Sequence, residues 1–599
     1  MKATVRIGGA SGFWGDSAVA APQLVRRGEV NYLVFDYLAE LTMSILVAQR
    51  AKDPGLGYAT DFVDVAMKSV LAEVAAKGIR VVANAGGVNP RACAAALARL
   101  AESAGVKLGI AVVEGDDVMP LLPQLREQGV REMFSGAPLP ERVASATAYL
   151  GAIPIARALA AGADVVVTGR CVDSALVLGP LMHEFGWAAD DYDRLAAASL
   201  AGHIVECGCQ ATGGLFTDWE SVPGWEDMGY PVLECASDGS FVVTKPAGTG
   251  GLVSVPAVAE QMLYEIGDPA SYVLPDVICD FSEVRLEQAG PERVRVTGAR
   301  GFAPTDRYKV SATWVDGFRA AGSLTIIGID AARKARRTGE AILARTRGIF
   351  RHLGLPDYAR ARVEVLGAED IYGPHARAGA TREAVLRVAV HHPVKQALEI
   401  FAREIAPAGT SWSPGTTGAG GRPGVSPLVR LFSFTVPKSA LAPTVTVGGE
   451  THAVAIPPGR ADAGSGRRPS PPGPAAPPEG TTVEVPLVAL AHGRSGDKGD
   501  SVNIGVIARE ARFLPLLRAQ LTPEAVKAWF AHLVRGDVVC YEVPGIGALN
   551  FVLHEALDGG GMASLRNDPL GKGFAQMLLD MPVKVPAALA RELGGTRLA

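Results

Sequence analysis

Short apolar segments alternate with longer segments of helical periodicity through the chain up to Gly202. Residues 4–9, 32–37, 79–85, 107–115 and 164–170 are typical of strands, and residues 61–78 and 91–105 are typical of helices. Strands that are apolar throughout and are separated by helices indicate a parallel sheet that is buried on both faces. We therefore predict an α/β fold with a largely parallel sheet and flanking helices, and we assign it to residues 1–250.

The rest of the chain is organised differently. Residues 239–245, 292–301, 307–317 and 323–330 predict strands, and residues 331–351 predict a long helix. This pattern indicates an α+β second lobe over residues 251–456. The segment 457–480 is rich in proline and glycine, so it predicts an extended linker that cannot bury a core. Residues 481–599 give strand, charged turn, strand, helix and strand, the order of a small ferredoxin-like α+β domain.

The charge and cysteine content exclude several classes of protein. Lysine plus arginine is 58 and aspartate plus glutamate is 62, which leaves a net charge of -4. Nucleic acids and anionic membranes call for a basic surface, so we expect neither as a partner. Seven scattered cysteines indicate a reducing compartment rather than a disulfide framework. We expect a cytoplasmic homo-oligomer that acts on a small molecule.

The first predicted strand runs into the loop "GGASGFWGDS". Its glycine spacing does not match the dinucleotide fingerprint, a P-loop lysine is missing, and Ser11 does not fit the nucleophile-elbow pattern. Two interpretations remain: a tight turn beside the sheet, or a loop whose amide groups bind an anion or a carbonyl. On the second interpretation the substrate-binding candidates are Gly8, Gly9, Ser11, Gly12 and Asp16.

Polar residues follow the other predicted strands as well. Ligands of open parallel sheets bind beyond the carboxyl ends of the strands, so we expect these residues to line one crevice. They are Asp36, Asn84, Gly86, Gly87, Asn89, Glu114, Asp116, Asp117, Thr168, Arg170 and Asp173. Asp116 with Asp117 would suit Mg²⁺, or would cap a helix. Arg170 with Asp173 would clamp a carboxylate and steer a proton, or would form a local salt bridge.

The stretch "GHIVECGCQATGG" gathers a histidine, a glutamate and two cysteines. The spacing from His203 to Cys207 and Cys209 could begin a zinc site, but no second Cys/His pair follows at a suitable spacing, so we predict no metal there. Glu206 is a candidate general acid or base and Cys207 a candidate nucleophile. The alternative is a pair of small buried cysteines in a tight glycine turn.

Two further segments predict anion binding. The loop before a helix that begins after Ser254 contains Lys245, Thr249, Gly250 and Gly251. In the C-terminal segment, the charged turn carries Arg494, Asp497, Lys498 and Asp500, more charge than a hairpin needs. On the long helix, Arg336, Arg337, Arg345 and Arg347 would meet CoA phosphates or form a solvated face.

Together, "GGASGFWGDS", "TGRCVDSALVLGP", "GHIVECGCQATGG", "GTGGLVSVPAVAEQMLYEIGDP" and "RSGDKGDSVNIGVIAR" resemble the acyclic terpene utilisation (AtuA-type) family over nearly the whole chain. The resemblance implies a large N-terminal domain, a small ferredoxin-fold-like domain and a place in the acyl-CoA catabolism of branched or isoprenoid acids. Some relatives look fused to acyl-CoA carboxylase domains. The resemblance carries no settled catalytic residues.

We therefore expect a hydratase or lyase that acts on a carboxylated acid or its CoA thioester. Such chemistry needs an oxyanion site and a positioned acid and base. The catalytic candidates are Asp116, Arg170, Asp173, Glu206 and Cys207. Apart from the CoA moiety of a substrate and Mg²⁺ at Asp116–Asp117, the sequence indicates no cofactor. Two alternatives stay open: a non-catalytic subunit that binds substrate for an acyl-CoA carboxylase, and a nucleotide-dependent oxidoreductase.

Overall fold

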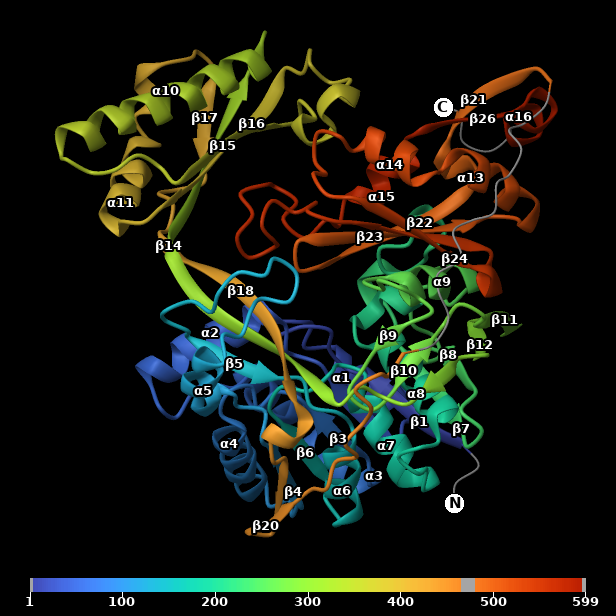
Figure 1. Cartoon of the computed structure of the whole chain (residues 1–599). Helices are drawn as coiled ribbons and strands as arrows, with labels where there is room; N and C mark the ends of the chain where they lie inside the picture. Colours follow the sequence, from blue (N-terminus) through green and yellow to red (C-terminus); the bar gives the residue numbers. More distant parts are fainter. Residues whose placement is uncertain (1–3, 465–479, 595–599) are drawn as a thin grey trace.

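A computed structural model describes residues 4–464 and 480–594 (Figure 1). Figure 1 shows three parts: a large helix-flanked sheet, a smaller sheet that carries α10 and α11, and the C-terminal domain. The predicted class is confirmed as mixed α/β with a ferredoxin-like C-terminal domain. Most of the predicted linker lies outside the described residues. Within the described ranges, no helix combines the length and the apolar character needed to cross a membrane.

The large sheet has eleven strands, and the five at its centre are parallel. The flanking strands are antiparallel, so the sheet is less uniformly parallel than the apolar segments predict. It also continues past residue 250, where a second lobe is predicted, because its edge strands come from later in the chain. The order is β11 (Arg285–Gly290), β12 (Arg293–Thr297), β8 (Phe241–Thr244), β7 (Val232–Ala236), β1 (Thr4–Gly9), β2 (Tyr32–Phe35), β3 (Arg80–Ala83), β6 (Val165–Thr168), β4 (Ile110–Glu114), β19 (Thr444–Val447) and β20 (Glu450–Ala453).

Helices cover both faces of the central strands, which explains why these strands are apolar throughout. Along β2, Leu33 and Phe35 join one core and Tyr32 and Val34 join the other. The first core contains residues of α1 (Ala20–Arg27), α3 (Lys68–Lys77) and α4 (Pro90–Ser103). The second contains residues of α5 (Leu122–Glu127), α6 (Ile153–Ala160), α7 (Ala175–Phe185), α8 (Tyr192–Val205) and α9 (Val255–Leu263).

A single long strand, β14 (Arg307–Ile327), connects the large sheet region to the second sheet (Figure 1). Two separate strands are predicted there, and the structure joins them across Gly317, whose φ is +80°. Residues on both sides of this glycine pair with neighbouring strands, so the backbone stays extended. The partners of β14 are β5 (Ser145–Ala148), β16 (Glu383–His392), β17 (Thr416–Ala419) and β18 (Ser426–Pro437), and β15 (Arg360–Leu366) pairs with β16. The helices α10 (Ala331–His352) and α11 (Lys395–Glu404) pack on this sheet, and α12 (Ala408–Ser411) follows.

The smaller elements of the first part include α2 (Glu40–Lys52) and a three-stranded sheet. That sheet contains β13 (Arg300–Phe302), β10 (Ile278–Asp280) and β9 (Tyr272–Val273).

The C-terminal domain is a four-stranded antiparallel sheet with its own core. The strands lie in the order β22 (Ala491–Lys498), β23 (Ser501–Ala508), β25 (Ala548–Leu553) and β24 (Val538–Val543). Three of the residues predicted to lie in the charged turn, Arg494, Asp497 and Lys498, are in fact on β22. The remaining elements are β21 (Thr482–Pro486), α13 (Leu514–Gln520), α14 (Pro523–Trp529), α15 (Phe574–Leu579), β26 (Pro582–Pro586) and α16 (Ala587–Leu593).

Two buried asparagines hold this domain against the turn after α9. Asn550 donates from Nδ2 to the carbonyls of Ile266 and Gly267, at 2.8 and 2.7 Å. Asn503 donates to the carbonyl of Leu263 at 2.6 Å and to Asn550 Oδ1 at 2.9 Å. Because these bonds are buried, they fix the C-terminal domain in one position relative to the large sheet.

Candidate functional site

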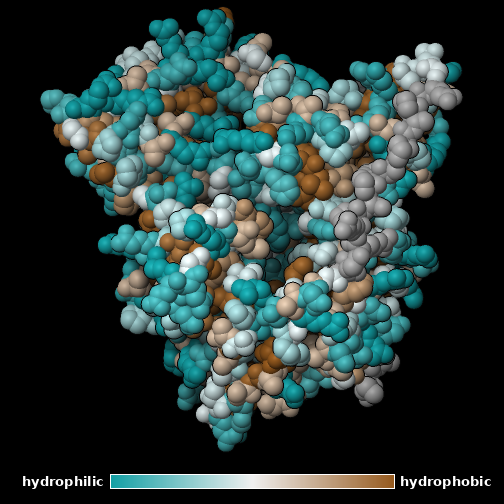
Figure 2. Space-filling model, viewed as in Figure 1, coloured by the Kyte–Doolittle hydropathy of each residue, from teal (hydrophilic) through white to brown (hydrophobic). Residues whose placement is uncertain are grey.

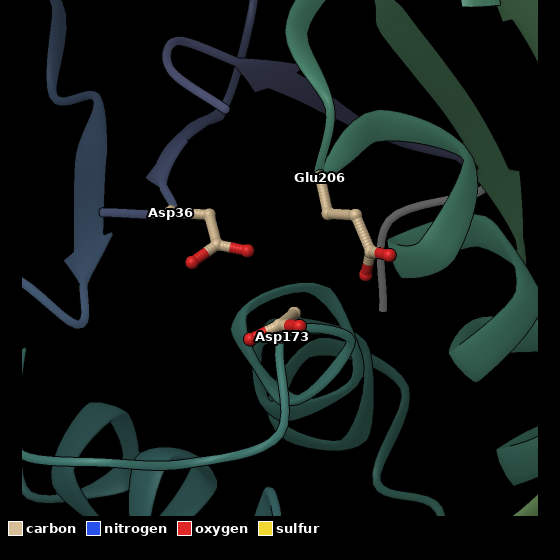
Figure 3. Close-up of side chains that lie close together, drawn as sticks. All are labelled: Asp36, Asp173 and Glu206. Carbon is tan, nitrogen blue, oxygen red and sulfur yellow. The ribbon is translucent and has the colours of Figure 1, made fainter. Parts of the chain in front are cut away.

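Three carboxylates from distant parts of the sequence converge beside the large sheet. One carboxylate oxygen each of Asp36, Asp173 and Glu206 lies within 4.8 Å of the others. Figure 3 shows the three side chains directed toward a common space from three separate segments. We call these residues the carboxylate triad.

The topology explains two members of the triad. Asp36 follows β2 and Asp173 follows β6, and these strands flank β3 in the parallel part of the sheet. Their carboxyl ends therefore open on the same edge, where ligands of such sheets bind. Glu206 does not follow a strand of this sheet; it is the first residue after α8.

Each carboxylate of the triad has a hydrogen-bonding partner. Asn84 donates from Nδ2 to Asp36 Oδ1 at 2.6 Å, and Arg170 donates to Asp173 Oδ1 at 3.2 Å. His203 Nδ1 lies 3.0 Å from Glu206 Oε1. The Glu206 carboxylate raises the pKa of His203 even though burial opposes this.

Burial and mutual repulsion raise the proton affinity of the two aspartates. Burial raises the pKa of Asp36 well above its ordinary value, and the charges of Asp173 and Glu206 raise it further. Burial also raises the pKa of Asp173 to about 6, against the Arg170 cation that lowers it. Neighbouring carboxyl groups whose surroundings shift their pKa values are candidates for a general acid and a general base.

A second charged group surrounds Arg170. The guanidinium lies 4.4 Å from the ring centre of Tyr149, and the Tyr149 hydroxyl donates to Glu40 Oε1 at 2.6 Å. Burial raises the pKa of Glu40, but Arg170, Lys309 and the Tyr149 hydroxyl lower it to about 2. The carboxylate of Glu40 therefore stays ionised near neutral pH. It lies with the cations of Arg170 and Lys309 next to the triad, whose aspartates have raised pKa values.

The C-terminal domain adds charge of both signs from β22 and from a loop. Lys498 lies 3.6 Å from Glu265, and its charge also acts on Asp173 and Glu40. Lys572 lies 3.2 Å from both Glu265 and Asp497. The Lys498 side chain keeps 54% of its surface exposed, so this edge of the cluster faces solvent. Figure 2 shows a hollow with mainly hydrophilic residues between the C-terminal domain and the large-sheet region.

The triad oxygens are also hard donors of the kind that Mg²⁺ or Ca²⁺ takes. Among the residues that the structure describes, this is the group of His, Cys, Asp and Glu side chains whose ligand atoms gather closely enough for a metal ion. The cluster lies away from the Asp116–Asp117 pair that the sequence suggests for Mg²⁺. Asn84, Arg170 and His203 each contact one of these carboxylates, which favours an acid–base role for the triad.

The predicted glycine loop after β1 lies against Asp36 and against the segment after Glu206. Ser11 donates from Oγ to the carbonyl of Asp36 at 3.1 Å. The amide of Gly9 donates to the carbonyl of Pro231, and that of Gly12 donates to Asp16. A Cβ on Gly12 would lie 2.9 Å from the carbonyl carbon of Cys207. These contacts position Asp36 and the segment after Glu206, and they engage the amides of Gly9 and Gly12 within the protein.

The remaining predicted residues of this region pack around the strand ends. Gly8 lies on β1 against Leu24, and Gly86 lies close to the carbonyl of Thr168. The Thr168 hydroxyl donates to the carbonyl of Gly169. Gly87 lies close to Leu46 and has a positive φ.

Cys207 directly follows Glu206, and burial and the Glu206 charge raise the pKa of its thiol well above the ordinary value. A thiol in this environment stays protonated, which disfavours the predicted nucleophile.

Asp116 contacts the backbone of Arg170, but it lines a different cavity from the triad. Its Oδ2 accepts a hydrogen bond from the backbone N–H of Arg170 at 2.8 Å, and it lines a separate cavity of about 500 Å³ with Asp117, Arg50 and Arg91. Burial raises the pKa of Asp116 to about 7. Asp116 therefore holds the backbone of Arg170 in position.

The loop 245–251 forms a closed structure of its own. Lys245 donates to the carbonyl of Thr249 at 2.8 Å, and the Thr249 hydroxyl donates to the carbonyl of Pro246 at 2.6 Å. Gly250 packs directly on Gly224, and Gly251 lies close to the carbonyl of Thr212. These contacts account for the glycines without a ligand, and they do not bring the loop to the triad.

Several residues of the site carry no local sequence signal. Glu40, Tyr149, Lys309, Glu265 and Lys572 lie in ordinary helical, strand or turn contexts, and packing alone brings them to the cluster. Asp36 and His203 are noticed in the sequence, but nothing there indicates that they meet Asp173 and Glu206. Arg336, Arg345 and Arg347 pair with Asp370, Glu404 and Asp357, as expected of a solvated helix face.

Comparison with known proteins identifies two regions of the chain. The family model described as acyclic terpene utilisation family protein AtuA matches residues 5–447, and the AtuA ferredoxin-like domain matches residues 485–584. No curated protein and no solved structure matches the chain.

Proposed function

The chain belongs to the acyclic terpene utilisation family AtuA, and on that premise we propose that it is a hydratase or lyase acting on a branched carboxylated acid or its CoA thioester. The observation that carries the proposal is the carboxylate triad, in which burial and neighbouring charges raise the pKa of Asp36 well above its ordinary value and burial raises that of Asp173 to about 6.

Dehydration of a hydroxy acid illustrates how this arrangement works. A base removes the proton next to the carbonyl group, and an acid protonates the hydroxyl group that leaves as water. Asp173 is suited to the first step and Asp36 to the second. Hydration is the same sequence in reverse, with the two roles exchanged.

The cations supply the charge that the substrate needs. Arg170 presents its guanidinium at the triad, and Lys309 and Lys498 approach from β14 and β22. A substrate carboxylate can pair with one of them, while another stabilises the negative charge that develops on the carbonyl oxygen. Glu40 keeps Arg170 and Lys309 in place by charge.

The test uses the purified full-length protein alone. Hydroxyglutaryl-type and unsaturated branched acyl-CoA esters are incubated with it, and mass spectrometry follows the gain or loss of water or the cleavage of a carbon–carbon bond. Glu206→Gln and Arg170→Ala are each expected to lower turnover at least about tenfold. The control is Glu127→Gln, because Glu127 is exposed on α5.

The pH profile tests the roles assigned to the two aspartates. Turnover should fall as the pH drops through about 6, because Asp173 then takes up a proton. Asp36→Asn removes the proton that the departing hydroxyl group needs, so it should lower turnover at least about tenfold. Full activity of both the Glu206 and the Arg170 variants would refute the site. If a chelator abolishes turnover and Mg²⁺ restores it, the acid–base assignment fails. If no ester changes and only a carboxylase co-purifies, the protein is a binding subunit.

A further inference from the structure

The second sheet has one apolar and one strongly basic face. Within the register of β14, β16 and β15, Arg319 pairs with His391, and His391 pairs with Arg360. Directly paired residues of antiparallel strands project from the same face. The neighbouring positions Phe318, Val390 and Ala361 project from the opposite face and belong to the core under α10 and α11.

A C-terminal loop covers the basic face, and its backbone carbonyl groups accept hydrogen bonds from three of the arginines. Arg319 donates to the carbonyl of Met562 at 2.9 Å, Arg360 to that of Asp558 at 3.0 Å, and Arg387 to that of Leu565 at 2.6 Å. The loop contains three consecutive glycines, 559–561. A Cβ on Gly559 would lie 3.5 Å from Arg430 Nη1 and 3.9 Å from Arg360 Nη1, so glycine leaves space between the two guanidinium groups.

The carboxylates on this face do not balance its arginines. Asp558 pairs with both Arg360 and Arg535, and Glu364 pairs with both Arg362 and Arg387. Asp316 pairs with Arg430. Arg566 binds the carbonyls of Ala556 and Leu533, with Asp500 as a nearby negative charge. Arg319 lies in the middle of this set, and burial and the Arg387 charge lower its pKa.

His391 provides an independent indication that this face binds a ligand. It is 2% exposed, and within the described part of the chain neither ring nitrogen has a hydrogen-bond partner. A buried polar group without a partner is unfavourable, so such groups call for an explanation. Burial and the charges of Arg360, Arg319 and Arg430 lower the pKa of His391 to about 4, with Asp316 opposing them.

We propose that the face formed by Arg319, Arg360, Arg430 and His391 binds the phosphate group of a phosphate-bearing ligand. Guanidinium groups bind phosphate oxygens with two parallel hydrogen bonds, and a neutral imidazole can donate a third. A phosphate dianion would also neutralise the charge that the carboxylates leave unbalanced. The phosphate groups of CoA and of free pyrophosphate would make the same contacts. Binding measurements with separate probes distinguish these two sources.

The proposed phosphate site is connected through the protein to the carboxylate triad and its cations. Phosphate binding there does not depend on the reaction proposed for the triad. Asp500 lies two residues after Lys498, and its Oδ1 accepts the amides of Leu557, Gly559 and Gly560. The loop that covers the arginines is therefore fixed to the same hairpin that carries Lys498. A ligand with a phosphate at one end and an acyl group at the other could occupy both places.

The experiment measures binding calorimetrically, without turnover, on the full-length protein. The probes are pyrophosphate, adenosine 3′,5′-bisphosphate, CoA and pantetheine, which has no phosphate. The phosphate-bearing probes are expected to bind more weakly as salt rises, and pantetheine is expected not to bind. Arg319→Gln should weaken binding about tenfold or more. Arg333→Gln is the control, because Arg333 is 83% exposed on α10 and should leave binding unchanged.

A second measurement on the unmodified protein guards against a variant that fails to fold. NMR titration of His391 should show its pKa rising when pyrophosphate binds, because a nearby anion favours the imidazolium. Tighter binding of CoA and the bisphosphate than of pyrophosphate would identify the CoA tail as the ligand. Equal binding would identify a site for phosphate alone. If none of the phosphate-bearing probes binds at millimolar concentration, or if the His391 pKa does not move, the proposal is wrong, whatever the outcome for the triad.

Discussion

Two carboxylates of the same site should have opposite effects on stability. Burial raises the pKa of Asp173 from 3.8 to about 6, so its ionised form is disfavoured in the folded protein. The cations around Glu40 lower its pKa from 4.5 to about 2, so its ionised form is favoured. We expect Asp173→Asn to stabilise the protein at neutral pH and Glu40→Gln to destabilise it.

The size of each effect follows from these pKa values. One pKa unit corresponds to ~1.4 kcal/mol, so each difference has an upper limit of ~3 kcal/mol. The Asp173 side chain keeps 31% of its surface exposed, and screening by solvent reduces its effect to ~1–2 kcal/mol. For Glu40 we expect a loss of ~2–3 kcal/mol, because its partners are within the protein.

The pH dependence of the two stability changes tests their direction a second time. Below the unfolded pKa of 3.8 Asp173 is protonated in both states, so Asp173→Asn changes nothing there. Its stabilising effect should grow between pH 4 and 6 and then stay constant. Glu40 stabilises the fold above its unfolded pKa of 4.5, and this contribution should disappear as the pH falls toward 2.

The assay is urea-induced unfolding of the two variants and the unmodified protein, followed by fluorescence at pH 5 and pH 7.5. The matched amide substitutions keep the size of each side chain, so the comparison isolates charge. If Asp173→Asn destabilises the protein at pH 7.5, or if the two variants shift stability in the same direction, the assignment of the titrating and the permanently ionised carboxylate is refuted.

Two further predictions concern the packing that builds the site. Asn550→Leu removes three buried hydrogen bonds at the domain contact, and we expect ~3 kcal/mol less stability in chemical denaturation together with faster proteolysis between the domains. The exposed Asn567→Leu should change neither property. Gly250→Ala would place a Cβ 1.9 Å from the carbonyl oxygen of Gly224, so we expect loss of soluble protein, whereas Gly424→Ala has open space and should express normally. Normal expression of the first alanine variant would show that the loop can move.

The central strands could be predicted because their signal is local. A strand buried on both faces leaves an unbroken apolar segment, and residues 4–9, for example, are the bounds of β1. The long strand β14 gives no such signal around Gly317, since polar residues and glycine interrupt the apolar pattern there. Its extended backbone is held by pairing with β16 and β18, which a single sequence does not reveal.

The same distinction applies to the site. Asn84, Arg170 and Asp173 follow strands, and the rule for ligand sites in parallel sheets brings them to one edge. The same rule places the glycine loop after β1 at that edge, where the amides of Gly9 and Gly12 bond within the protein. Lys309 comes from β14, which the sequence predicts only as part of a second lobe, so no local rule could place it at the triad.

Three carboxylates at such short range repel one another, and burial together with this repulsion raises the pKa of Asp36 and Asp173. Arg170 offsets the repulsion from within the large sheet, Lys309 from β14 and Lys498 from the C-terminal domain. Because the cations come from three separately packed parts, the pKa of Asp173 depends on all of them, and that of Asp36 depends on Arg170. The asparagine contacts that fix the C-terminal domain therefore also fix the acid–base properties of the site. The C-terminal domain therefore contributes Lys498 to the candidate site.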